Sequence, residues 1–231
     1  MSFVLVHGAG MSAECWQRLV PLLDGDTIAV DLPGRAARSD IDLRSVTLTD
    51  CEEAIVRDVL DADLSDIVLV AHSFAGVSVP RVMAALAPRL RHVVFLSAVV
   101  PQDGTRVLDQ IDPDVRGSVE AGIAGGVYTV GIDAARYMLC NDADEEQSEF
   151  ILGRLVDDAA AMLAETVDLS GYRLPIPRTY VRLGRDQCYP PDLQAKSIDR
   201  VGANVVTLDA GHMAMVTIPE QVAEILNNLA R

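Results

Sequence analysis

The sequence has few basic residues and almost no lysine. Lys196 is the only lysine among 19 basic residues, whereas 34 residues are acidic, and the formal net charge is −15. A protein that binds the phosphate backbone of nucleic acid needs clusters of Lys or Arg, and this sequence has none. We therefore expect no nucleic-acid partner.

Cysteine and long apolar runs are also scarce. No apolar run reaches the roughly 18 residues that a membrane-spanning helix needs, and the N-terminus lacks a secretory leader. We therefore expect no membrane partner and a cytoplasmic location. The cysteines stand singly, without zinc-site spacing, and are predicted to be free thiols: Cys15, Cys51, Cys140 and Cys188.

What the sequence does contain is an alternation of short β-branched runs with longer helical patterns. Half of the 231 residues are hydrophobic, which is enough for one compact domain. The alternation is typical of an α/β fold with a mostly parallel central sheet flanked by helices. The predicted strands are 3–7, 27–30, 67–71, 92–97, 178–183 and 204–208. The predicted helices are 12–22, 49–60, 75–86 and 219–229.

Two local signals refine these helices. Thr49 with Glu52 three residues later fits a capping box at the start of the second helix. Pro80 falls inside the third helix, where it removes a backbone donor, so that we expect a kink there or a helix that begins nearby.

The pattern changes between 101 and 175. Strand-like runs stop, and short helical stretches separated by glycine replace them. This indicates a helical cap at 101–175 inserted between two core segments, 1–100 and 176–231.

Ser73 is the strongest candidate for a catalytic residue. A buried strand runs directly into Ser73 and on into a helix, which is the layout of a nucleophile elbow. The usual pattern is G-x-S-x-G, but Ala71 and Ala75 replace both glycines here. A serine that merely caps the helix on an ordinary turn remains an alternative.

A serine nucleophile needs a base, and the sequence offers four histidines. His212 follows the last predicted strand, at the same sheet edge as Ser73. His7 ends a strand, His72 is part of the turn at Ser73, and His92 opens a strand. His212 is therefore the candidate base, with a structural loop histidine as the alternative.

The third member of such a triad is a carboxylate between the serine and the histidine in the sequence. Asp186 directly follows the strand 178–183 and is our candidate. Asp192, Asp209 and Asp103 are competitors at less suitable positions.

An oxyanion formed during acyl transfer needs two hydrogen-bond donors. The loop His7-Gly8-Ala9-Gly10 and the residue after Ser73 supply candidates, the backbone N–H groups of Ala9 and Phe74. A dinucleotide-binding turn is the competing interpretation of this loop, but the G-x-G-x-x-G pattern is broken at Ala13.

Together, these motifs and their order resemble the α/β-hydrolase superfamily, and within it the group of plant methyl-ester esterases and hydroxynitrile lyases. The resemblance covers nearly the whole chain. It implies that Ser73, His212 and Asp186 are catalytic and that Ala9 and Phe74 bind the oxyanion. The lyases of this group carry a lysine after the histidine, a threonine in place of Gly8 and a glutamate before the serine. This chain has Met213, Gly8 and His72, which matches the esterase pattern.

The sequence thus predicts a serine carboxylic-ester hydrolase that acts on small neutral esters without a metal or organic cofactor. A hydroxynitrile lyase, a lactonase, an amidase or a non-catalytic binding protein on the same fold are the alternatives. The expected partner is a small-molecule ester, and a homodimer is left open. We expect the cap, which includes Leu139 and Leu155, to cover an apolar pocket. Its Met and aromatic residues fit the core of the cap better than a substrate site: Tyr128, Met138 and Phe150.

Overall fold

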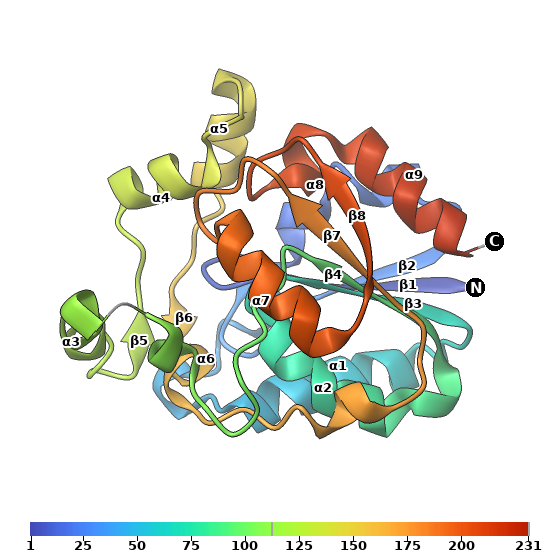
Figure 1. Ribbon diagram of the computed structural model, residues 1–231, viewed down its shortest axis with the longest axis horizontal. Helices are drawn as coiled ribbons and strands as arrows, with labels where there is room; N and C mark the ends of the chain where they lie inside the picture. The colour runs from blue at the N-terminus through green and yellow to red at the C-terminus, as the bar shows by residue number, and fades with distance from the viewer. Residues whose placement is uncertain (112, 231) are drawn as a thin grey trace.

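A six-stranded parallel sheet forms the centre of the computed structural model, which describes residues 1–111 and 113–230 (Figure 1). Position 112 of the predicted cap and position 231 of the predicted core lie outside the described residues. The strand order is β2-β1-β3-β4-β7-β8, and each neighbouring pair is parallel. The strands are β1 (Ser2–Val6), β2 (Asp26–Val30), β3 (Ile67–His72), β4 (Leu90–Leu96), β7 (Arg178–Leu183) and β8 (Asn204–Leu208).

The predicted α/β fold is confirmed, and the burial of the strands explains why the sequence reveals it. Every residue of β1 and β3 is buried, because helices cover both faces of the sheet. Strands buried on both faces are read as continuous apolar runs rather than as alternating patterns. All six predicted strands are present, with ends shifted by two residues at most.

Helices α1 (Leu48–Asp61) and α2 (Ala75–Leu86) cover one face of the sheet, and α8 (Ala214–Thr217) and α9 (Pro219–Ala230) cover the other (Figure 1). Helix α7 (Pro191–Val201) joins β7 to β8. None of the helices in the described part of the chain is long and apolar enough to span a membrane. The four cysteines are free thiols, as predicted.

Two helix predictions need correction. The capping box of α1 is formed by Thr47 and Asp50, not by Thr49 and Glu52, since the helix begins earlier than predicted. The expected helix 12–22 is wrong: the segment forms two 3₁₀ turns, Ala13–Trp16 and Val20–Leu22. Pro21 has no N–H to donate to a preceding carbonyl, so a continuous α-helix is disfavoured there.

Helix α2 runs from Ala75 through Pro80, so the expectation that it begins near Pro80 is wrong. Pro80 cannot donate to the carbonyl oxygen of Gly76, four residues earlier. The hydroxyl of Tyr172 donates to that oxygen instead, at 2.6 Å. A side chain outside the helix thus replaces the missing backbone donor.

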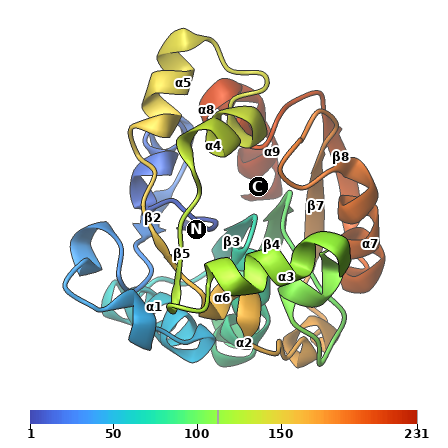
Figure 2. The same ribbon diagram turned by 90° about the vertical axis from the view of Figure 1, so that its left-hand side faces the viewer.

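Most of the segment 101–175, which we call the cap segment, lies beyond the carboxyl ends of the central strands (Figure 2), and its last residues pack against α2. Its elements are α3 (Pro113–Gly122), α4 (Ile132–Leu139), α5 (Glu145–Leu152), α6 (Ala161–Ala164) and the strands β5 (Val127–Tyr128) and β6 (Asp158–Ala159). The antiparallel β5–β6 pair contradicts the expectation that strands are missing here. Two residues per strand are too few to produce a recognisable alternation.

Candidate active site

Ser73 occupies a strained turn between β3 and α2. Its φ angle is +53°, in the left-handed region that side chains rarely adopt. The Ser73 carbonyl accepts a hydrogen bond of 2.8 Å from the N–H of Val99, and its own N–H donates to Leu96 at 3.2 Å. Bonds to the end of β4 and to the residues after it therefore hold the serine in this conformation.

The glycines of the G-x-S-x-G pattern let the strand and the helix approach each other closely. In this chain, glycines at other positions have that role. Ala71 and Ala75 are fully buried and fit without glycine. A Cβ at position 76 would come within 2.3 Å of the Val99 carbonyl oxygen, and a Cβ at position 8 within 2.5 Å of the Ser73 Cβ. The turn at Ser73 therefore requires Gly76 and Gly8 rather than glycine at the two positions of the motif.

His212 and Asp186 form a buried pair at the same edge of the sheet. The Nδ1 atom of His212 lies 2.7 Å from Oδ2 of Asp186, and both side chains are almost fully buried. Asp186 follows β7, while His212 lies after β8, so two adjacent strands deliver them. The competing carboxylates are not at His212 Nδ1: Asp209 pairs with Arg185, Asp103 pairs with Arg173, and Asp192 lies in the first turn of α7.

Three more donors hold the Asp186 carboxylate. Its Oδ1 accepts from the backbone N–H groups of Cys188 and Tyr189, both at 2.8 Å. Its Oδ2 accepts from the Ser97 hydroxyl at 2.6 Å. These bonds fix the orientation of the carboxylate that faces the histidine ring.

Contact between the two side chains favours the charged form of each, so the pKa of His212 is raised and the pKa of Asp186 is lowered. Burial opposes the charge of His212, but the Asp186 carboxylate and the Cys188 side chain together outweigh it and hold the pKa of His212 well above its ordinary value. For Asp186, burial likewise opposes the charge, but the histidine and the hydrogen bonds lower the pKa of the carboxyl. Asp186 can therefore stabilise a protonated imidazole.

The other three histidines have structural partners. His7 accepts a hydrogen bond from the Leu32 N–H at 3.2 Å and donates to Gly8, and burial lowers its pKa to about 4. His92 pairs with the Thr179 hydroxyl. His72 donates from Nε2 to the carbonyl oxygen of His212 at 3.0 Å, which anchors the loop of the candidate base.

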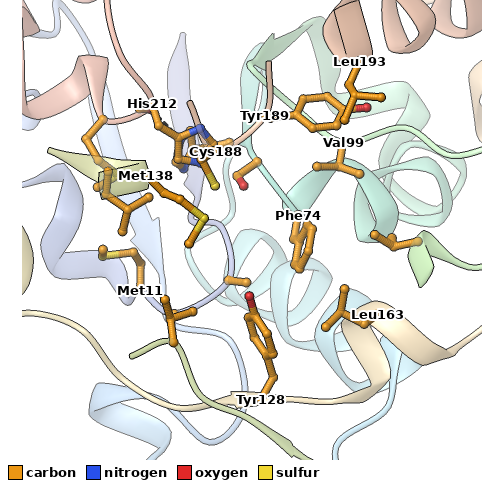
Figure 3. Close-up of a pocket in the computed structure, with 18 of the residues that line it drawn as sticks. Met11, Phe74, Val99, Tyr128, Met138, Leu163, Cys188, Tyr189, Leu193 and His212 are labelled. Carbon is orange, nitrogen blue, oxygen red and sulfur yellow. Dashed lines mark hydrogen bonds between the residues drawn. The ribbon is translucent and has the colours of Figure 1, made fainter. Parts of the chain in front are cut away.

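Ser73 and His212 line one cavity of about 390 Å³, together with Ala9 and Phe74. Most of its other lining residues are apolar, and Figure 3 shows their side chains around the space below His212. The structure thus brings all five predicted site residues together: four line the cavity, and Asp186 lies behind His212. Phe74 is the N-cap residue of α2, close to N–H groups that have no acceptor within the helix.

Residues of the cap segment form a large part of the cavity wall. Four of the five residues singled out in the sequence line it, namely Tyr128, Met138, Leu139 and Leu155. Leu139 and Leu155 thus line the cavity as expected, whereas Tyr128 and Met138 also line it, contrary to the expectation that they form the core of the cap. Phe150 instead packs against the guanidinium groups of Arg18 and Arg154.

Two site residues were missed in the sequence. Ser97 has a positive φ of 43° at the end of β4, beside the strand that carries Asp186. Its position at the carboxyl end of a strand is the signal that could have identified it. Cys188 lines the cavity, and its thiol lies beside the His212 ring (Figure 3). A single cysteine on a loop carries no such signal.

The chain is similar to known hydrolases over its whole length. The family model described as "Alpha/beta hydrolase family" matches residues 3–225. A carbendazim hydrolyzing esterase of Nocardioides sp. (strain SG-4G) is 28% identical, covering 96% of this chain and 97% of its own. Methylesterase 1 of Arabidopsis thaliana is 27% identical over 99% of this chain and 95% of its own length. An extracellular α/β-hydrolase from a Paenibacillus species has a similar structure, with a TM-score of 0.88, 25% identity and coverage of 100% and 99% of the two chains.

Proposed function

We propose, since this chain belongs to the α/β-hydrolase family, that it is a serine carboxylic-ester hydrolase acting on small neutral esters. The relatives named as esterases support a hydrolase of this kind. One observation carries the finer proposal. The strained Ser73 and the buried pair of His212 and Asp186 come from three different strand ends and meet at one apolar cavity.

In the proposed reaction, Ser73 Oγ attacks the ester carbonyl while His212 Nε2 takes the hydroxyl proton. Asp186 stabilises the resulting imidazolium. The N–H groups of Ala9 and Phe74 bind the negative oxygen of the tetrahedral intermediate. Collapse breaks the ester bond, His212 gives its proton to the leaving alcohol, and the acyl group remains on Ser73. Water activated by His212 then releases the acid and restores the serine.

The cavity and the surface charge support the choice of substrate. The lining is largely apolar, which favours small uncharged groups on either side of the ester. The net charge of −15 disfavours the approach of anions and favours departure of a carboxylate product. We also propose that the cap segment selects the substrate, because its residues form a large part of the cavity wall.

The test is a panel of neutral esters and lactones, assayed with the wild type and with Ser73→Ala. We expect turnover by the wild type, a loss of at least about 10³-fold in Ser73→Ala, and covalent labelling of Ser73 by an organophosphate. Ser78→Ala is the matched control, because Ser78 is buried in α2, away from the cavity lining. Ester turnover that survives in Ser73→Ala would refute the serine mechanism.

The panel also separates esters from lactones, which the same residues could open. A mandelonitrile assay tests the lyase alternative. A cation beside the histidine would be needed to hold departing cyanide, but position 213 is a buried methionine in the cavity wall. The single lysine, Lys196, is exposed on α7. We therefore expect cyanide release to be far slower than ester hydrolysis.

A further inference from the structure

Two aspartates of the cap segment hold the loops that carry the candidate base and oxyanion donor. Asp142 accepts a hydrogen bond of 2.6 Å from the N–H of Gly211, the residue before His212. Asp158 accepts one of 2.8 Å from the N–H of Gly10, the residue after Ala9. The sequence separations are 69 and 148 residues, so both are long-range contacts between the cap segment and the core.

The contact at Asp142 is close and well buried. The Asp142 side chain is 1% exposed; its Oδ2 also accepts from the Thr217 hydroxyl and lies 3.7 Å from the guanidinium of the half-exposed Arg185. A Cβ at position 211 would lie 2.4 Å from Oδ1 of Asp142, so only glycine allows this approach. The neighbouring Asn141 donates to the carbonyl of Arg185, the residue before Asp186. Consecutive residues of the cap segment thus bind the loops of both the base and the acid.

The contact at Asp158 includes an ion pair in which both side chains are buried. The partner of Asp158 in this pair is Arg35. A second bond runs beside it, from the N–H of Val156 to the carbonyl of Gly10 at 3.0 Å. Gly10 has a φ of +71°, so its left-handed conformation is held on both sides of the residue. A buried charge pair of this kind is costly to disrupt when only one partner is removed.

We propose that Asp142 and Asp158 are positioning residues, through which the cap segment holds His212 and the Ala9 N–H in the geometry for catalysis. Neither touches the reacting atoms. Asp142 holds the N–H of Gly211 beside His212, and Asp158 holds the N–H of Gly10 beside Ala9. The cap segment is then part of the catalytic framework as well as a wall of the substrate cavity. This inference rests on the proposed function.

The two aspartates respond differently to replacement by asparagine. At position 142 the amide oxygen can face Gly211 and still accept its N–H, so Asp142→Asn retains the bond that Asp142→Ala removes. At position 158 the guanidinium of Arg35 is only a donor, so it takes the amide oxygen and leaves the NH₂ group toward Gly10. Asp158→Asn therefore loses the bond to Gly10.

The experiment combines steady-state kinetics with amide hydrogen exchange of the folded proteins. For Asp142→Ala we expect kcat to fall by about 10- to 100-fold, since small misplacements of reacting groups have effects of that size, with KM within about twofold. Exchange at Gly211 should accelerate by at least about tenfold, whereas exchange at Gly10 stays unchanged. Asp142→Asn should recover most of kcat. Asp133→Ala, an exposed aspartate of the same segment, is the control and should behave as the wild type.

For Asp158→Asn we expect the reverse pattern, with faster exchange at Gly10 and not at Gly211, and a similar fall in kcat. Since this variant can fail to fold, Arg35→Met with Asp158→Asn is the second variant. Without Arg35 the amide oxygen can turn toward Gly10, at the cost of the bond that the Ala159 N–H makes to Oδ1 of Asp158, so protection at Gly10 and kcat should recover in part.

The outcomes separate the two proposals. Unchanged exchange at Gly211 in Asp142→Ala refutes the inference, whether or not the protein hydrolyses esters. Faster exchange with unchanged kcat also refutes it, because the contact would then be structural only. Equal losses in Asp142→Asn and Asp142→Ala would assign the effect to charge and overturn the positioning role. A wild type without ester turnover or Ser73 labelling refutes the proposed function, and the exchange data alone then decide whether the cap segment holds these loops.

Discussion

The Tyr172 hydroxyl donates a 2.6 Å hydrogen bond to the carbonyl oxygen of Gly76. This oxygen is the one that Pro80 leaves without a backbone donor inside α2. The bond joins the helix behind Ser73 to the end of the cap segment. It is reinforced at position 171, where glycine is required because a Cβ would overlap the Pro80 carbonyl oxygen.

We predict that Tyr172→Phe lowers the free energy of unfolding by about 1–3 kcal/mol, because it leaves a buried carbonyl without a donor. The measurement is urea unfolding of the wild type and the variant. Pro80→Ala is the matched second change, since it restores an N–H that can reach Gly76. The loss should be smaller in the Pro80→Ala background, and equal losses in both backgrounds would contradict this account of α2.

A second prediction concerns pH. His212 must be neutral to act as a base, and its pKa is held well above the ordinary histidine value. Lowering the pH through that raised pKa therefore protonates the base, and kcat/KM should fall toward acid and level off toward alkaline pH. In Asp186→Asn this limb should move to lower pH, and kcat should fall by about 10³- to 10⁴-fold. Asp192→Asn serves as the control and should keep the wild-type profile. A loss of activity in Asp192→Asn but not in Asp186→Asn would make Asp192 the carboxylate of the triad.

A third prediction follows from the thiol beside the base. Cys188 lines the cavity, whereas the other three cysteines are buried. A small neutral thiol reagent such as iodoacetamide should abolish ester turnover, because the added group fills the space at His212. Cys188→Ser should resist the reagent, while Cys140→Ser should remain sensitive. Inactivation of Cys188→Ser at the wild-type rate would show that the reagent acts elsewhere.

A fourth prediction concerns stability in acid. Burial lowers the pKa of His7 to about 4, below its value in the unfolded chain, so the unfolded state binds the proton more readily. The contribution of His7 is fully present above the unfolded pKa and is lost as the pH falls toward the folded pKa. Between about pH 7.5 and about pH 5 this loss should be about 2 kcal/mol.

The comparison for this prediction is His7→Gln, whose amide offers a donor and an acceptor but does not titrate in this range. Urea unfolding at both pH values should show a smaller acid loss for His7→Gln than for the wild type. Identical losses would mean that His7 does not contribute to the acid sensitivity.

The strands and the candidate site could be predicted because both follow from local rules. Strands covered by helices on both faces are continuous apolar runs, and residues just after parallel strands meet at one edge. Ser73, Asp186 and His212 each follow a strand in this way. The number of residues between these strands does not say how far apart their ends lie. A parallel sheet, however, brings the carboxyl ends of its strands to one edge.

What the sequence could not provide depends on partners far away along the chain. Nothing near Pro80 indicates that Tyr172 supplies its missing donor. Likewise, Asp142 and Asp158 are two among many acidic residues, and their role becomes visible only when Gly211 and Gly10 lie against them. The two-residue strands of the cap segment are too short for any periodicity.

The buried pair of Arg35 and Asp158 also bears on how the cap segment can move. A large outward swing of the cap segment would break this pair and the bonds to Gly10 and Gly211, and would loosen the loops that carry the candidate base and oxyanion donor. If these contacts position the candidate site as proposed, an open cap segment and a competent site exclude each other. A substrate that enters while the cap segment is open can then react only after the segment has closed and these contacts have formed again.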